Sequence, residues 1–180
     1  MSKQVRDRKK LNLIDKNENK SKNLLENIFI MELTTCFQQM PANARVWVYQ
    51  SNRLFNEQEG EAIQTQIADF TAQWAAHGQP LSACGQLLYQ RFIVLMVNEQ
   101  LHGASGCSID TSVKFLKSLE QQYQLNLFNR LLVTYLNDKN QVKSLSLADF
   151  KLQLAQNKLN QHTIVFNNLV QTKAEFEQQW

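Results

Sequence analysis

One apolar run constrains the fold of this chain more than any other feature. Residues 92–97 read Phe-Ile-Val-Leu-Met-Val, which is continuous rather than alternating. Such a run is typical of a central strand that is buried on both faces of a sheet. We therefore expect a sheet with helices on one or both faces. A chain of 180 residues is long enough for one domain of this kind and too short for two comfortable ones.

Periodicity and capping residues place the first elements. Arg45–Gln50 alternates and is predicted to be a strand, and residues 56–77 are predicted to be a helix. Asn56 and Glu59 have the spacing of a capping box, and Gly78 and Pro80 would end the helix. Its apolar stripe consists of Ile63, Ile67, Phe70 and Trp74.

The remaining elements follow by the same rules. Residues 81–97 are strand-like, and Gln90-Arg91 is either a turn between two strands or part of one long strand. The other predicted elements are a helix over 111–124, a strand over 130–136, a hairpin loop over 137–140, a returning strand over 141–144 and a strand over 163–166. Between the last two strands we predict a helix that is capped by Ser146 and Asp149 and has Leu147, Phe150 and Leu154 pointing inward. A last helix is predicted to be capped by Thr172 and Glu175, with Phe176 and Trp180 on one face. The predicted fold class is α+β, a single domain with a mixed, largely antiparallel sheet of about five to six strands and about four helices.

Charge divides the chain at about residue 30. Residues 1–30 carry eight basic and four acidic side chains, and we predict that they form a disordered basic leader. Met31 is predicted to be the natural start, with residues 1–30 produced by an over-extended reading frame. Residues 31–180, the predicted domain, carry eleven basic and twelve acidic side chains. This near-neutral balance argues against a nucleic-acid partner.

The cysteines and the apolar runs predict a cytoplasmic location. Cys36, Cys84 and Cys107 are odd in number and form no C-x-x-C pair, so we expect three reduced thiols and no zinc site. No apolar run reaches the length of about 18–20 residues that a membrane span needs, and no signal peptide is evident. We predict no membrane association, no metal and no cofactor.

The segment 103–110, Gly-Ala-Ser-Gly-Cys-Ser-Ile-Asp, is the strongest local signal for a site. It follows the buried strand and precedes a helix, where free amides and the helix dipole suit an anion. Its two glycines would let the backbone turn with positive φ. The candidate ligand-binding residues are Gly103, Ser105, Gly106, Ser108 and Asp110. The alternative is a tight turn that ends in an N-cap at Ser108 or Asp110.

Cys107 in this segment is the candidate catalytic residue. A thiol near a helix N-terminus has its thiolate form favoured, and His102 is a candidate base. No third member of such a set is fixed by the sequence. The alternative is a small side chain packed in a crowded turn.

Several strings resemble a family of short bacterial proteins without an established activity, which are often labelled "ABC transporter ATPase". They are Val46–Gln50, Gln73–Gly78, Phe92–Leu95, Gly103–Val113 and Thr163–Val170, and the resemblance covers residues 45–180. It implies that family members extend past the residue that matches Trp180. It implies no catalytic residues.

The ATPase label is not supported by the motifs. An ABC ATPase needs G-x-x-x-x-G-K-[ST] to hold the β and γ phosphates, whereas Gly103 and Gly106 have another spacing and the next lysine is Lys114. We predict no ATP hydrolysis. Three functions stay open: a non-catalytic module that binds a protein or a small ligand, which we favour; an enzyme that uses Cys107; and anion or nucleotide binding at 103–110 without hydrolysis.

Overall fold

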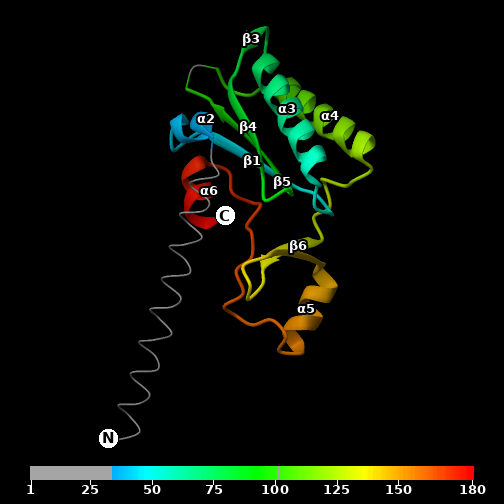
Figure 1. The fold of residues 1–180 in the computed structure, drawn as a ribbon. Helices are drawn as coiled ribbons and strands as arrows, with labels where there is room; N and C mark the ends of the chain where they lie inside the picture. The colour runs from blue at the N-terminus through cyan, green and yellow to red at the C-terminus, as the bar shows by residue number, and fades with distance from the viewer. Residues whose placement is uncertain (1–33, 101) are drawn as a thin grey trace, which may run out of the picture. The chain divides into compact units, whose positions relative to one another are not determined.

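Figure 1 shows the computed structural model of the chain, which describes residues 34–100 and 102–180. Apart from Thr34 and Thr35, the described residues belong to the second of two compact units, residues 36–180. The predicted leader, residues 1–30, and the predicted start at Met31 lie outside the described residues.

The described part alternates helices with short antiparallel strands. In chain order the elements are α2 (Thr35–Gln39), β1 (Arg45–Gln50), α3 (Glu57–Gln73), β2 (Ala75–Ala76), β3 (Gln79–Pro80), β4 (Ser82–Leu88), β5 (Phe92–Asn98), α4 (Gly106–Tyr123), β6 (Leu132–Leu136), β7 (Val142–Ser146), α5 (Leu147–Ala155) and α6 (Lys173–Gln179). The predicted α+β class is confirmed. The strands are divided among three antiparallel sheets, with the orders β1-β5-β4, β2-β3 and β6-β7.

The apolar run at residues 92–97 is the central strand β5, as predicted. Residues 92–97 of this strand are all buried, and β1 and β4 pair with β5 on either side. Tyr89 (φ 52°) and Gln90 (φ 48°) adopt the left-handed conformation between β4 and β5. Residues 81–97 are therefore two strands, and the turn begins one residue before the Gln90-Arg91 step.

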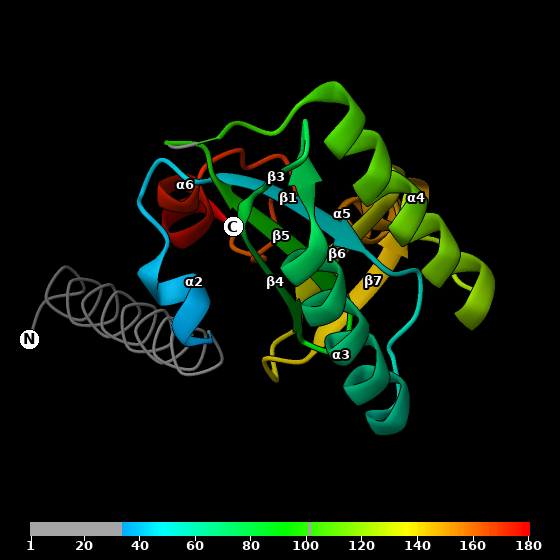
Figure 2. The same ribbon diagram turned by 90° about the horizontal axis from the view of Figure 1, so that it is seen from above.

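Helices α3 and α4 lie side by side over one face of the central sheet (Figures 1 and 2). Their buried side chains meet the odd-numbered side chains of β5 in one core that contains Ile63, Ile67, Trp74, Leu116, Leu119, Ile93, Leu95 and Val97. At Gly85 of β4, an added Cβ would overlap Ile67 Cγ2 of α3. The absence of a side chain at Gly85 therefore lets α3 approach the sheet closely.

Helix α3 begins as predicted but ends early. Asn56 Oδ1 accepts from Glu59 N at 2.9 Å and Glu59 Oε2 accepts from Asn56 N at 3.0 Å, which is the predicted capping box. The helix ends at Gln73, and the β2–β3 hairpin turns at His77 (φ 51°) and Gly78 (φ 77°). The predicted continuation to His77 is wrong because these two left-handed residues form a hairpin turn and not a helix end.

The other face of the central sheet carries α2 and α6. Phe37 of α2 contacts Phe176 of α6 edge to face, and Trp180 stacks on Phe176 with ring centroids 4.7 Å apart. Trp180 also contacts Phe92 of β5, at 5.0 Å. The predicted pairing of Phe176 and Trp180 on one face is confirmed. These contacts place the two ends of the unit on the same face of the sheet.

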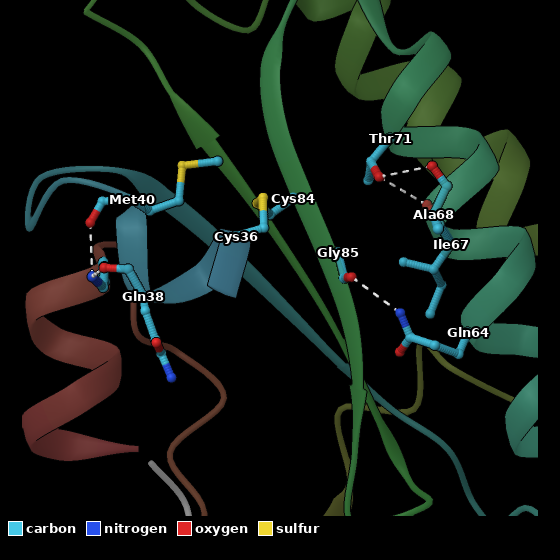
Figure 3. Close-up of a disulfide and its surroundings, with 10 residues drawn as sticks. Cys36, Gln38, Met40, Gln64, Ile67, Ala68, Thr71, Cys84 and Gly85 are labelled. Atoms are coloured by element: carbon cyan, nitrogen blue, oxygen red, sulfur yellow. Dashed lines mark hydrogen bonds between the residues drawn. A yellow bond between two sulfur atoms is a disulfide. The ribbon is translucent and has the colours of Figure 1, made fainter. Parts of the chain in front are cut away.

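A disulfide joins α2 to the central sheet. Cys36 and Cys84 of β4 are bonded, with Cα atoms 6.2 Å apart (Figure 3). The prediction of three reduced thiols is therefore wrong for this pair, while Cys107 is free. Sequence spacing could not reveal the bond because 48 residues separate the two cysteines. Disulfides are rare in a reducing cytoplasm, so the bond removes one support for the predicted location.

The β6–β7 hairpin is attached to the end of β1 through polar side chains. Gln50 Nε2 donates to Leu132 O at 2.6 Å, and Thr134 Oγ1 donates to Gln50 Oε1 at 2.9 Å. The loop at 137–140 and the Ser146 cap of α5 are as predicted. The predicted strand at 163–166 is reduced to one bridge, between Val165 and Tyr135.

Helix α5 packs differently from the prediction. Leu147 and Leu154, which were expected to point inward, are each 37% exposed, and Phe150 is partly buried against Tyr135. The hairpin on which α5 packs has two strands and is too narrow to cover the whole apolar face of the helix. None of the described helices has the length and apolar character needed to cross a membrane.

Candidate functional site

The Gly/Ser segment connects β5 to α4, but the helix begins earlier than predicted. Helix α4 starts at Gly106 instead of residue 111, and its N-cap is Ser105, whose side chain accepts from Ser108 N at 3.3 Å. The predicted N-caps, Ser108 and Asp110, are both inside the helix. Cys107, Ser108 and Asp110 therefore belong to its beginning and not to a loop.

The two glycines of the segment, Gly103 and Gly106, do not adopt the positive φ that was expected of them. Among the described glycines, Gly78 alone has a positive φ. Gly103 and Gly106 are exposed, and a Cβ at Gly106 would meet nothing within 4 Å. The expectation that these glycines allow a left-handed turn is wrong, and Gly106 is simply the first helical residue.

A carboxylate of the chain itself already lies on this segment. Glu99 Oε1 accepts from Ala104 N at 2.9 Å and lies 3.5 Å from Arg45 Nη1. An incoming anion would meet the negative charge of Glu99 next to the amides that were expected to bind it. This geometry favours a self-contained turn over an anion site. The predicted ligand-binding role of the segment stays a prediction.

Ser108 is part of the packing between α4 and the end of α3. The residue is 2% exposed, and its hydroxyl donates to Ser105 O at 2.8 Å. Its carbonyl oxygen accepts from the indole Nε1 of the buried Trp74 at 2.8 Å. Both polar groups of Ser108 are therefore occupied by hydrogen bonds within the protein, and its hydroxyl is not available at the surface.

Cys107 and His102 are both exposed, and no hydrogen bond joins their side chains in the described part of the chain. The carbonyl of Cys107 accepts from Thr111 Oγ1 at 2.9 Å, which is an ordinary contact within a helix. The thiol is accessible to reagents, but no side chain of the described residues forms a hydrogen bond with it as a base would. The catalytic roles of Cys107 and His102 stay predictions.

The described residues bring together no group of three His, Cys, Asp or Glu side chains that could hold a metal ion. The described cysteine Cys36 is bonded to Cys84 and so is not a free ligand.

The sequence did not reveal a concentration of exposed apolar side chains in the C-terminal third. Of the nine large apolar residues that are exposed in the described part, Leu54 alone lies outside residues 128–169. We call three of the others, which a backbone hydrogen bond and the helical spacing of α5 place together, the apolar surface: Leu131, Leu147 and Leu154. Leu147 N donates to Leu131 O at 2.7 Å, so these two residues are neighbours. The available signal was an amphipathic helix of nine residues next to a hairpin of only two strands.

No family model, curated protein or solved structure matches this chain. The resemblance of residues 45–180 to the family labelled "ABC transporter ATPase" therefore stays a prediction from the residue strings.

Proposed function

We propose that this chain is a non-catalytic protein-binding module whose contact site is the apolar surface at the start of the β6–β7 hairpin and on α5. The observation that carries the proposal is the exposure of its leucines: Leu131 is 64% exposed, and Leu147 and Leu154 are each 37% exposed. Scattered single apolar residues are normal on a protein surface, whereas a concentration of them marks an interaction site.

The position of the leucines on α5 supports one connected contact area. Leu147 and Leu154 are seven residues apart, two helical turns, and so lie on the same side of α5. Leu131 joins Leu147 through the backbone hydrogen bond that continues the hairpin ladder. A partner surface that spans two turns of α5 would therefore meet all three side chains.

Exposed basic side chains in the same stretch of the chain indicate the chemistry of the partner. Residues 128–170 carry five basic side chains, all exposed, and two acidic ones, whereas residues 31–180 as a whole have a net charge of −1. The five are Arg130, Lys139, Lys143, Lys151 and Lys158. The fitting partner is a protein with an apolar patch bordered by carboxylates, because charge complementarity guides such encounters.

This proposal is favoured over the two alternatives on geometry. Catalysis by Cys107 would need a base, and the described part of the chain offers the thiol no hydrogen-bonded one. Anion binding at residues 103–110 would bring a second negative group beside Glu99. A contact site made of exposed leucines requires neither.

Site-specific photocrosslinking in the native host tests the proposal. A photoreactive phenylalanine analogue is placed at Leu154, and at Gln121 on the exposed side of α4 as the matched control. We expect a protein that crosslinks at position 154 and not at 121. That protein, once purified, should bind the full chain at least about ten-fold more weakly when Leu154→Asp is introduced, a loss typical of an apolar anchor.

Two results would contradict the proposal. Equal crosslinking from positions 154 and 121 would show that the apolar surface has no preferred partner. Binding by the purified partner that is unchanged in Leu154→Asp would place the contact elsewhere. The variant must unfold at the same urea concentration as the wild type, and a side chain that is already exposed should meet this condition.

A further inference from the structure

Arg91 is a buried arginine at the end of the central sheet. It is 6% exposed, and its Nη1 donates to Ser51 O at 3.0 Å. Ser51 is fully buried, and its amide donates back to Arg91 O at 2.9 Å. The pair thus continues the β1–β5 ladder one step past Gln50 and Phe92. The guanidinium is held in place by the strand itself.

One edge of this guanidinium has no partner. Arg91 Nε is the single fully buried side-chain nitrogen or oxygen in the described part of the chain that lacks a hydrogen bond. Nη2 has no hydrogen-bond partner among the described residues either, but it is not sealed from the surface. Nε–H and the outer Nη2–H point in the same direction. This is the edge with which arginine grips the two oxygens of a carboxylate or phosphate.

The positive charge of Arg91 is also uncompensated. Arg45 and Arg53 each have a carboxylate partner, Glu99 and Glu59, while no ion pair to Arg91 exists among the described residues. Burial lowers the pKa of Arg91 from its ordinary value because desolvation disfavours the charged form. An arginine nevertheless stays protonated in a protein. A buried charge without a partner is strongly unfavourable, so a counter-charge has to come from elsewhere.

We infer that the Nε and Nη2 edge of Arg91 is a binding site for an oxyanion, the carboxylate or phosphate group of a small molecule. Ser51 O fixes Nη1 and so orients the free edge before the anion arrives. The anion would satisfy the one orphaned buried donor of the described chain and neutralise its charge in one contact. This site shares no residue with the apolar surface, and neither proposal depends on the other.

Anion titrations of the full 180-residue chain test the site. Unfolding temperatures are measured at pH 7 in sodium phosphate and in sodium acetate, against sodium chloride at the same ionic strength. We expect at least one of the two oxyanions to raise the unfolding temperature saturably, by about 3–5 °C at ten times its Kd. Phosphate and acetate distinguish the two kinds of oxyanion. Arg91→Lys keeps the positive charge but loses the two parallel N–H donors of the guanidinium, and it should lose the response. Arg45→Met removes a partly exposed arginine outside the site and should keep the response.

A direct readout guards against variants that fail to fold. In a proton–nitrogen correlation spectrum of the wild type, the Arg91 Nε–H signal should shift during the same titration, and it is identified by its absence in Arg91→Lys. The proposal is overturned if this signal moves with neither anion when each is raised to about a hundredfold molar excess over the protein. So does an equal response in Arg91→Lys and wild type. Arg91→Met is a second variant without the charge: a stability difference from the wild type that is the same in chloride, acetate and phosphate would also overturn the proposal, because no anion would then act through Arg91.

Discussion

Lys173 Nζ donates a hydrogen bond to Met40 O at 2.7 Å, and so the last helix of the chain holds the end of the first described one. The same nitrogen donates to Gln38 O at 2.9 Å, and the residue is buried. The carbonyls belong to the C-terminal end of α2 and its exit, where a positive charge is favourable. Three kinds of interaction therefore hold α2 in place: the Lys173 hydrogen bonds, the Phe37–Phe176 ring contact and the Cys36–Cys84 disulfide.

Removing the Lys173 ammonium should destabilise the protein. Lys173→Met keeps the apolar stem but leaves the carbonyls of Gln38 and Met40 without their charged donor. We expect the free energy of unfolding to fall by about 2–3 kcal/mol in urea denaturation. Lys117→Met on the exposed side of α4 is the matched control and should change it by less than about 0.5 kcal/mol. Equal losses in the two variants would show that the Lys173 hydrogen bonds contribute little.

The disulfide should contribute more than this lysine. Closing a loop over a separation of 48 residues restricts the unfolded chain by about 4 kcal/mol in the chain-entropy account. Reduction of the wild type by a dithiol should therefore lower the free energy of unfolding by an amount of this order. The double variant Cys36→Ser, Cys84→Ser should be insensitive to the reductant, whereas Cys107→Ser should respond like the wild type.

Thiol counting provides the check on the same bond. The native, unreduced protein should react with one equivalent of a thiol reagent, at the exposed Cys107, and with three after reduction and unfolding. Three reactive thiols before reduction would contradict the disulfide and restore the prediction that was made from the sequence.

The sequence predicted best where a residue acts on its own neighbours. The caps at Asn56, Ser146 and Thr172 were all placed correctly, because a cap is a hydrogen bond between residues three apart. The start of α4 was misplaced because Ser105, Ser108 and Asp110 are all good caps. In the structure the indole of Trp74 donates to Ser108 O, a contact between residues 34 positions apart that the local sequence does not reveal.

Properties that depend on the rest of the fold were not predictable. The sequence shows Arg91 as one charged residue near a turn, and only the pairing with Ser51 reveals that it is buried with an orphaned nitrogen. The stripe of Leu147 and Leu154 was correctly periodic, but periodicity does not reveal whether a surface exists to cover it. Both proposed sites were therefore recognised from the burial or exposure of side chains in the fold, and not from sequence motifs.

The Arg53–Glu59 pair should make stability depend on acid pH. Arg53 Nη1 and Nη2 donate to the two oxygens of Glu59 at 2.7 and 2.8 Å, and Nη2 also donates to Tyr123 O at the end of α4. The hydrogen bonds from Arg53 first, and from the Asn56 amide second, lower the pKa of Glu59 from 4.5 to about 2. A lowered pKa means that the contribution is present above pH 4.5 and is lost as the pH falls to about 2.

Carbon NMR titration of the Glu59 carboxyl group measures this directly. The wild type should titrate near pH 2, and Arg53→Met should move the midpoint back toward 4.5. In parallel, Glu59→Gln should unfold at a lower temperature than the wild type at pH 7, and the two should converge near pH 2. A wild-type midpoint near 4.5 would show that the forked pair does not persist in solution.

Gly85 provides the most sensitive test of how α3 packs on the sheet. An added Cβ would overlap Ile67 Cγ2 of α3, whose side chain faces Gly85 in Figure 3. It would also lie 3.0 Å from both Leu95 Cδ2 and Thr71 Cγ2, so a shift of one neighbour alone would not make room for it. The helix cannot simply retreat, because Gln64 Oε1 accepts from Leu87 N at 2.8 Å and ties α3 to the outer edge of β4. We expect Gly85→Ala to lower the free energy of unfolding by about 1–3 kcal/mol in urea denaturation. Gly106→Ala is the matched control: it adds the same methyl group at the start of α4, where nothing lies within 4 Å, and it should be neutral or slightly stabilising. A Gly85→Ala protein as stable as Gly106→Ala would mean that α3 does not approach β4 this closely.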